Sequence, residues 1–241
     1  MTNPTTNTSL TNYARVAGFA YLAIIITSIL TLIFVESKLV VDGNAAATTQ
    51  NIMANELLFR IGLAVDLFMF AGVVLLSLAL YIILKTVNKN LALLALLWRM
   101  TEAVLGGVTV LAGMVVVLLL NGKDYFTIFG TEQLQALVML FLNVRTAGFH
   151  IVIIFVGLGS IVFFYLFFKS KYIPRILAAF GIASFFLMLV GSLVNILTPH
   201  YAELAMLSYA PAILFELTIG AWLLIKGVDV EQWEKSALKS A

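Results

Sequence analysis

Six long apolar stretches dominate the sequence, and each is long enough to cross a lipid bilayer as a helix. The hydrocarbon core of a membrane is about 30 Å thick, which takes about 20 helical residues to span. The short alternating segments of an outer-membrane barrel do not occur in the sequence, so the backbone polar groups must be satisfied within helices. We therefore predict an all-α bundle of six transmembrane helices. They lie near residues 14–35, 57–84, 91–120, 134–168, 176–198 and 209–226.

The composition excludes several classes of protein. Hydrophobic residues make up 62% of the chain and charged residues only 11%, whereas about a quarter of the residues in a soluble domain are charged. A soluble globular enzyme is therefore excluded. The net charge of +2 leaves no basic excess to neutralise the phosphates of a nucleic acid. With no cysteine and only two histidines in the sequence, we predict no metal site and no cofactor.

The distribution of charge between the stretches predicts an orientation. The connections 85–90 and 169–175 and the C-terminal tail collect basic residues, whereas the two alternate connections, 36–56 and 121–133, are mainly acidic. Because cytoplasmic loops collect lysine and arginine, both termini are predicted to lie in the cytoplasm, as in a protein of the inner membrane. The alternate connections hold Glu36, Asp42, Glu56, Asp124 and Glu132 against Lys38 and Lys123.

The chain is predicted to consist of one membrane domain between two short tails. Residues 1–13 form a polar tail, residues 14–226 the six-helix domain and residues 227–241 a cytoplasmic tail. Because residues 1–13 lack the basic segment of a signal peptide, we expect the first stretch to remain as an uncleaved helix.

Polar and ionisable side chains inside the six stretches are the candidate functional residues. A charge at the centre of a bilayer costs roughly 2.5 to 3.5 kcal/mol, so these groups must face inward and pair, or face water. We take them as a candidate ligand-binding set, with no catalytic role assigned. They are Arg60, Asp66, Arg99, Glu102, Arg145, His150, Asn195 and Glu216.

Distances along each helix from the basic residues at its predicted inner end give the depth of these groups. Arg99 and Glu216 each lie ten residues from such a lysine, or about 15 Å, near the middle of the membrane with Glu102 one turn away. The corresponding separations place Asp66, His150 and Asn195 in the outer third of the membrane, and Arg60 and Arg145 at the outer headgroups. We therefore predict a polar cleft that opens outward.

Small and polar residues recur at helical spacing on four of the stretches, which predicts four stripes facing one interior. Small residues let helices approach closely, while polar residues bond across them. The stripes are Arg99, Glu102, Gly106, Thr109 and Gly113; Asn143, Thr146, His150, Gly157 and Ser160; Gly181, Ser184, Gly191 and Asn195; and Tyr209, Ala212, Glu216 and Gly220.

Each candidate also has a purely structural interpretation. Arg99 and Glu102 lie three residues apart and can neutralise each other on one helix. Glu216 has no charged neighbour on its own helix, so it needs a partner from another helix, a proton or a ligand. His150 can be an interior histidine with a satisfied hydrogen bond, or it can share a proton with Asp66.

The two outer arginines leave a similar choice. Arg60 and Arg145 can bind lipid phosphates at the headgroups or gather an anionic substrate into the cleft.

Several segments together resemble a known family. Three of them, Leu80–Lys85, Asn88–Leu94 and Trp98–Ala103, are similar to the central signature of an uncharacterised bacterial family of integral-membrane proteins, that of domain of unknown function 4386. The opening segment Ala14–Leu22 and the final helix Pro211–Gly220 are also similar to it. The resemblance covers nearly the whole chain and implies a cytoplasmic-membrane protein, but it implies no activity.

Three functions remain open from the sequence. The first is the binding of a small molecule or a lipid in the cleft, with transport coupled to a proton on Glu216 or Glu102. The second is an enzyme acting on a lipid headgroup, with His150 and Asp66 as an acid–base pair. The third is a structural or partner-binding protein in which each charge only supports the fold. We expect the bilayer itself as a partner, a small-molecule or lipid ligand, and no nucleic acid.

Overall fold

A computed structural model describes residues 4–122 and 128–240, so Lys123 and Asp124 lie outside the described residues. The prediction of six spans is confirmed within this part of the chain, because six of its helices are long and apolar enough to cross a membrane. The spans are Ser9–Leu39, Glu56–Leu84, Lys89–Asn121, Thr131–Ser170, Arg175–Leu197 and Ala205–Ile225.

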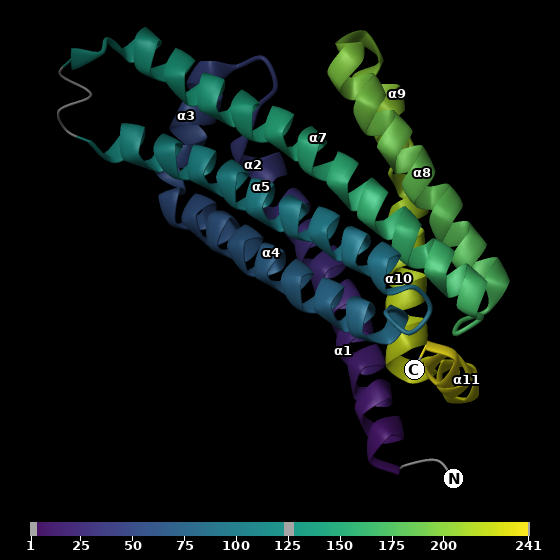
Figure 1. Ribbon diagram of the computed structural model, residues 1–241. Helices are drawn as coiled ribbons and strands as arrows, with labels where there is room; N and C mark the ends of the chain where they lie inside the picture. Colours follow the sequence, from purple (N-terminus) through teal and green to yellow (C-terminus); the bar gives the residue numbers. More distant parts are fainter. Residues whose placement is uncertain (1–3, 123–127, 241) are drawn as a thin grey trace. The chain divides into compact units, whose positions relative to one another are not determined.

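The spans are built from the following elements (Figure 1). The first span contains α1 (Pro4–Thr31), a π-helical turn η1 (Leu32–Glu36) and α2 (Ser37–Leu39). The next four are α4 (Glu56–Leu84), α5 (Lys89–Asn121), α7 (Thr131–Ser170) and α8 (Arg175–Leu197). The short η2 (Pro199–Tyr201) and α9 (Ala202–Leu207) lead into α10 (Ala210–Ile225), and α11 (Val230–Ser240) comes after the last span.

The first connection differs from the prediction in two ways. The first helix continues through η1 and α2 to Leu39, so Glu36 lies inside the span rather than in the loop. The rest of the connection contains α3 (Ala45–Ala54), which begins where the Asn44 side chain accepts a hydrogen bond from the backbone N–H of Ala47. Asparagine favours this capping position because its side chain satisfies a free N–H of the first turn. A hydropathy pattern does not reveal either feature.

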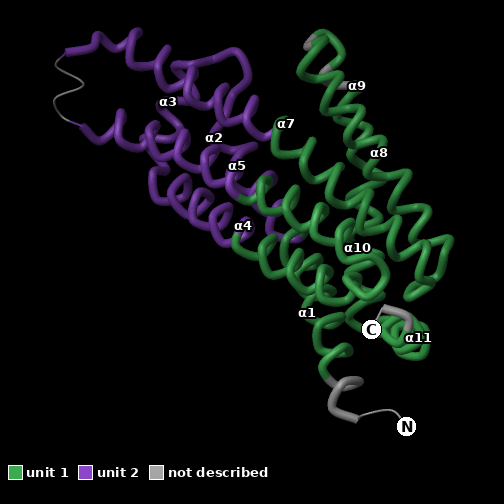
Figure 2. The backbone as a smooth tube through the Cα atoms, viewed as in Figure 1, with its two compact units in different colours: residues 1–25, 71–103, 150–241 green, residues 26–70, 104–149 purple. Residues whose placement is uncertain are grey.

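The contacts divide the chain into two compact units (Figure 2). Unit 1 contains residues 1–25, 71–103 and 150–241, and unit 2 contains residues 26–70 and 104–149. The helices α1, α4, α5 and α7 each contribute residues to both units.

The core of unit 1 is a cluster of aromatic rings from α7, α8 and α10. Phe164 meets the ring of Phe215 edge-on, with the centroids 4.6 Å apart, and stacks on Phe185 at 5.8 Å. These three rings are fully buried. In the same unit α1 approaches α10 closely, since a Cβ added to Gly18 would lie 2.4 Å from the backbone nitrogen of Leu224. Small residues at the crossing permit that approach.

The core of unit 2 also depends on glycines that admit large side chains. In this unit α4 and α5 lie side by side, with the ring of Phe70 against Gly106 and the side chain of Leu63 against Gly113. Phe70 and Leu63 are buried. Gly106 and Gly113 belong to the predicted stripe on α5, so this stripe faces the interior as expected.

The other stripes have mixed outcomes. On α8, Gly181, Ser184 and Gly191 are buried, as predicted. On α10, Ala212 and Gly220 are buried while Glu216 is half-buried. The interior prediction is wrong for the first half of the α7 stripe, because Asn143 and Thr146 are exposed there.

An apolar row explains the error on α7. Leu134, Val138 and Leu142 are buried in this half of the helix. Asn143 lies one residue beyond this row, or about 100° further around the helix, and so points away from the interior.

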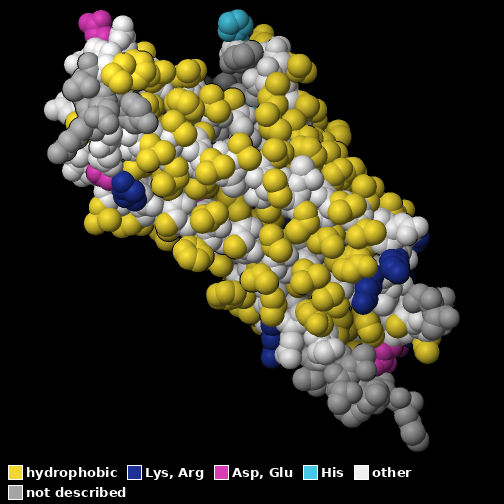
Figure 3. Space-filling view, turned by 60° about the vertical axis from the view of Figure 1, so that its left-hand side comes forward, with side chains coloured by type: hydrophobic (Ala, Val, Ile, Leu, Met, Phe, Trp, Pro, Cys, Tyr) yellow, Lys and Arg dark blue, Asp and Glu magenta, His cyan; other side chains and the backbone are white. Residues whose placement is uncertain are grey.

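The surface has the character of a membrane protein. Large hydrophobic side chains are exposed on all six spans, including Phe19 at 67%, Phe68 at 77% and Val104 at 68%. In Figure 3 hydrophobic side chains cover most of the visible face and charged ones are few. A soluble protein rarely exposes apolar surface on this scale, whereas a bilayer accommodates it. The protein is therefore a multi-pass membrane protein.

Candidate functional site

The most deeply buried charges are Arg99 and Glu102, one turn apart on α5. Nη1 of Arg99 lies 2.7 Å from Oε2 of Glu102, and each residue is only 3% exposed. The contact is an ion pair without hydrogen-bond geometry, and these two atoms have no hydrogen-bond partner among the described residues. Gly159 of α7 makes room for the arginine stem, since a Cβ there would lie 2.8 Å from Cγ of Arg99. The pairing expected from the three-residue spacing is thus confirmed.

Glu216 of α10 and Tyr21 of α1 join this pair. Arg99 interacts electrostatically with Glu216 as well as with Glu102, so Glu216 has the charged partner from another helix that the sequence required. The Tyr21 side chain is 2% exposed and interacts electrostatically with all three charged groups. We call Tyr21, Arg99, Glu102 and Glu216 the inner cluster; all four residues belong to unit 1.

The inner cluster contains one guanidinium and two carboxyl groups. Its members lie on membrane-spanning helices, where water is not available to solvate an excess charge. Glu216 is half-buried, while Arg99 and Glu102 have almost no accessible surface. Glu216 is therefore the least buried of the three charged residues in this cluster.

Unit 2 contains a second arginine between two carboxylates. Arg145 of α7 donates through Nη1 to Oε1 of Glu36 at 2.8 Å and through Nη2 to Oδ2 of Asp66 at 2.5 Å. The side chains of Arg145 and Asp66 are 17% and 14% exposed, and that of Glu36 is 39% exposed. A small void of about 10 Å³ lies beside Glu36 and Arg145. We call Glu36, Asp66 and Arg145 the outer cluster.

Arg60 is engaged by its own helix. Its Nε donates to Oε1 of Glu56 at 2.5 Å, and the same oxygen accepts a hydrogen bond from Nδ2 of Asn121 at 2.7 Å. The side chains of Arg60 and Glu56 are about two-fifths exposed, at 43% and 38%. This pair ties the start of α4 to the end of α5 within unit 2.

His150 and Asn195 lie in unit 1. Nδ1 of His150 lies 3.2 Å from the hydroxyl of Tyr209, and its backbone carbonyl accepts a hydrogen bond from Ser192 at 2.7 Å. Nδ2 of Asn195 is buried without a hydrogen-bond partner among the described residues. The acid–base pair of His150 with Asp66 stays a prediction.

The two units divide the residues of the predicted cleft. Unit 1 holds Arg99, Glu102, His150, Asn195 and Glu216, and unit 2 holds Arg60, Asp66 and Arg145. A single cleft containing all of them therefore stays a prediction. Within each unit, the structure brings an arginine together with two carboxyl groups.

Two partners in these contacts, Tyr21 and Glu36, are not recognisable from the sequence pattern. Tyr209 belongs to the predicted interior stripe near residues 209–226, but it is not one of the predicted ligand-binding residues. The charge pattern predicts Glu36 in the first connection, whereas the first span continues past it to Leu39. A π-helical turn is often found at functional sites, but neither hydropathy nor residue spacing reveals one.

Comparison with models of protein families assigns the chain to one family. The family model described as "Domain of unknown function (DUF4386)" matches residues 16–227. The chain belongs to this family, so the resemblance seen in the sequence is confirmed. Neither the curated proteins nor the solved structures give a match to the chain.

Proposed function

We propose that this member of the family of domain of unknown function 4386 binds a small molecule or a lipid within its transmembrane helices and couples that binding to a proton held by the inner cluster. Movement of the ligand across the membrane in exchange for the proton is the expected activity. We further propose that both termini lie in the cytoplasm, as the basic connections predict.

The observation that carries the proposal is the imbalance of charge in the inner cluster. Arg99 balances one carboxylate, so the second carboxyl group needs a proton or a bound cationic group. A group that must hold a proton when no ligand is present, and can release it when a ligand replaces it, is the requirement for proton coupling. A purely structural cluster would need only the balanced pair of Arg99 with Glu102.

The side chains of the cluster have separate roles in this proposal. Glu216 receives the proton or the polar group of the ligand, because Glu216 is the less buried of the two glutamate residues. Arg99 holds whichever carboxylate is charged, and its Nη1 has hydrogen-bonding capacity left. Tyr21 lies within electrostatic range of both carboxyl groups.

A structural role is the competing function, and the Arg99–Glu102 contact of 2.7 Å supports it. Ion pairs one turn apart neutralise each other within a helix and need no ligand. The two functions differ in Glu216. The structural role needs only the balanced pair of Arg99 with Glu102, so it does not explain the second carboxyl group.

Native mass spectrometry of the protein in a mild detergent tests the proposal. We expect a discrete, stoichiometric bound mass on the wild type, with an occupancy that changes with pH, and its loss from Glu216→Gln. Glu132→Gln, which removes an exposed carboxylate at the start of α7, is the matched control and should keep the ligand.

The competing outcomes are distinct. Equal occupancy in the wild type, Glu216→Gln and Glu132→Gln would show that the ligand does not use the inner cluster. A bare polypeptide mass for all three proteins would favour the structural role.

A further inference from the structure

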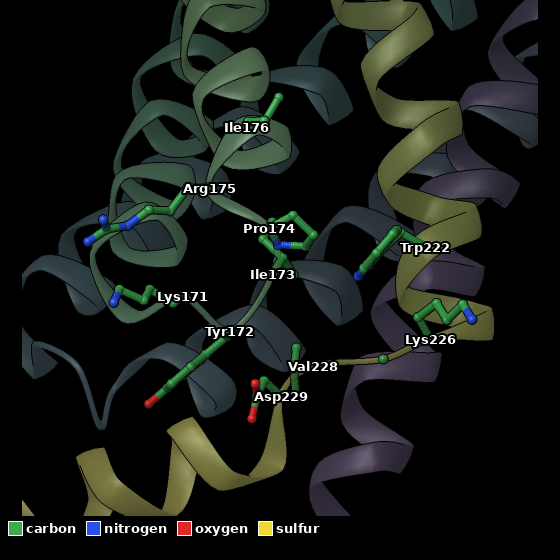
Figure 4. Close-up of a pocket in the computed structure, with 11 residues that line it drawn as sticks. Lys171, Tyr172, Ile173, Pro174, Arg175, Ile176, Trp222, Lys226, Val228 and Asp229 are labelled. Carbon is green, nitrogen blue, oxygen red and sulfur yellow. The ribbon is translucent and has the colours of Figure 1, made fainter.

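A hollow of about 710 Å³ lies where three membrane helices of unit 1 end (Figure 4). Lys171 comes directly after the last residue of α7, Arg175 is the first residue of α8, and Lys226 comes directly after the last residue of α10. All three cations line the hollow and are exposed. The inner cluster does not contribute to the lining, so the role of this hollow is independent of the proposed function.

We propose that this hollow is a binding site for the phosphate group of an anionic phospholipid. Lys171 and Arg175 lie on one side of the hollow and Lys226 on the other, and Figure 4 shows their charged ends pointing outward from it. In the proposed complex these long, exposed side chains turn toward one headgroup, and the acyl chains continue along the adjoining helices. Basic pockets between the ends of transmembrane helices are suited to such headgroups, because each cation near the membrane surface attracts anionic lipid.

The backbone at this point shapes the hollow for an anion. Lys171 has a positive φ of 61°, which turns the chain sharply between α7 and α8. Pro174 precedes α8 and cannot cap it, and no side-chain hydrogen bond from this position satisfies the first turn. The first N–H groups of an uncapped helix attract anions, so α8 adds partial positive charge to that of the three cations.

The one acidic side chain of the lining does not neutralise these cations. Oδ1 of Asp229 accepts a hydrogen bond from the backbone N–H of Gln232 at 3.0 Å and caps α11. The backbone N–H of Asp229 donates to the carbonyl of Tyr172 at 2.9 Å. Asp229 is thus held by the turn that it forms, and three cations against this one carboxylate leave the lining with a net positive charge.

The apolar part of the lining identifies a lipid rather than a soluble anion. Trp222 lies one turn before Lys226 on α10, and Figure 4 shows both on the same side of the hollow. Tryptophan favours the level of the headgroups. Ile176, next to Arg175, is 87% exposed, and Ile225, next to Lys226, is 74% exposed. Apolar surface therefore adjoins the cations directly, as the junction of a headgroup with its acyl chains requires.

The nearby aromatic contacts hold the site in place. The guanidinium of Arg175 lies over the ring of Phe168 at 5.3 Å from its centroid. The hydroxyl of Tyr172 lies 3.0 Å from that of Thr86, and the indole N–H of Trp233 donates to the carbonyl of Ile83 at 3.1 Å. These contacts fix the connection and α11 against the end of α4, all within unit 1.

The test is a titration of the delipidated, full-length protein with phosphatidylglycerol, phosphatidylcholine and inorganic phosphate, monitored by native mass spectrometry. The variant Lys171→Gln/Arg175→Gln/Lys226→Gln removes the three cations of the hollow. The matched control, Arg15→Gln/Lys85→Gln/Lys89→Gln, removes one arginine and two lysines that are exposed elsewhere in unit 1.

We expect the wild type and the control to bind the first phosphatidylglycerol roughly tenfold or more tightly than phosphatidylcholine. The hollow variant should lose this preference while it still elutes as a folded protein. Equal affinity of the wild type for both lipids, or an equal loss of preference in the control, would overturn the proposal. Saturation by inorganic phosphate that displaces the lipid would assign the hollow to a soluble anion and would also overturn it.

Discussion

Removing both carboxyl groups of the inner cluster should cost far more stability than removing either one. Glu102→Gln and Glu216→Gln each leave Arg99 with one carboxylate, so each cluster remains balanced and the expected change in unfolding free energy is within about 1 kcal/mol. The double variant leaves Arg99, which is 3% exposed, without any charged partner in the cluster. An uncompensated buried charge costs about 3 to 5 kcal/mol.

We compare the change in unfolding free energy of the double variant with the sum of the changes in the two single variants. The difference measures how far the two carboxyl groups share Arg99. We expect an interaction energy of about 1 kcal/mol or more between Glu102 and Glu216. Unfolding in mixed micelles with increasing denaturing detergent, monitored by tryptophan fluorescence, supplies the free energies. Glu102→Gln combined with Glu132→Gln is the control, and its two changes should add to within about 0.5 kcal/mol.

Additive changes in the Glu102 and Glu216 variants would refute the reasoning, because they would mean that Arg99 is not shared. A further variant tests whether the lost stability comes from the unpaired charge of Arg99. Adding Arg99→Leu to the double variant removes the unpaired charge and should recover most of the lost stability, because replacing a complete buried ion network with apolar groups is often neutral.

Other contacts in the two units give three further predictions. In the outer cluster, Arg145→Leu should lower the thermal midpoint in detergent more than Asp66→Asn, because only the former leaves two carboxylates without their donor. Gly18→Val should reduce the folded yield on size-exclusion chromatography, since the added atoms would meet backbone rather than a flexible side chain, with overpacking of about 1 to 3 kcal/mol. Burial raises the pKa of Tyr172 above its ordinary value of 10.0, against the opposing effect of its hydrogen bonds. The contribution of the neutral phenol to stability is therefore complete below pH 10.0, the pKa of the unfolded chain. It is lost as the pH rises through the higher pKa of the folded protein. Tyr172→Phe should accordingly lose less stability in alkaline solution than the wild type, as measured by unfolding at a series of pH values.

The sequence predicted the number of spans and most of their limits because hydropathy and length depend on residues along one helix. The second to fifth spans begin and end within about three residues of their predicted limits, a usual margin for helix ends. The first span was predicted too short, since a hydropathy pattern does not reveal a helix that continues past a charged residue such as Glu36.

The candidate site was predicted less completely because its partners lie on different helices. The pairing of Arg99 with Glu102 depends on a spacing of three residues and is visible in the sequence. The pairing of Arg145 with Asp66 and Glu36 joins residues 79 and 109 positions apart, and no helical spacing reveals it. The sequence indicated that Glu216 needs a partner from another helix, but only the fold identifies Arg99 as that partner.

Infrared difference spectroscopy of the wild type, Glu102→Gln and Glu216→Gln across neutral pH tests most directly whether the inner cluster holds an exchangeable proton. We expect the wild type to show the carbonyl band of one protonated carboxyl group, and this band to disappear in either variant because each then has a balanced pair with Arg99. The absence of a protonated carboxyl band in the wild type, or a band of equal strength in all three proteins, would contradict a proton shared by Glu102 and Glu216.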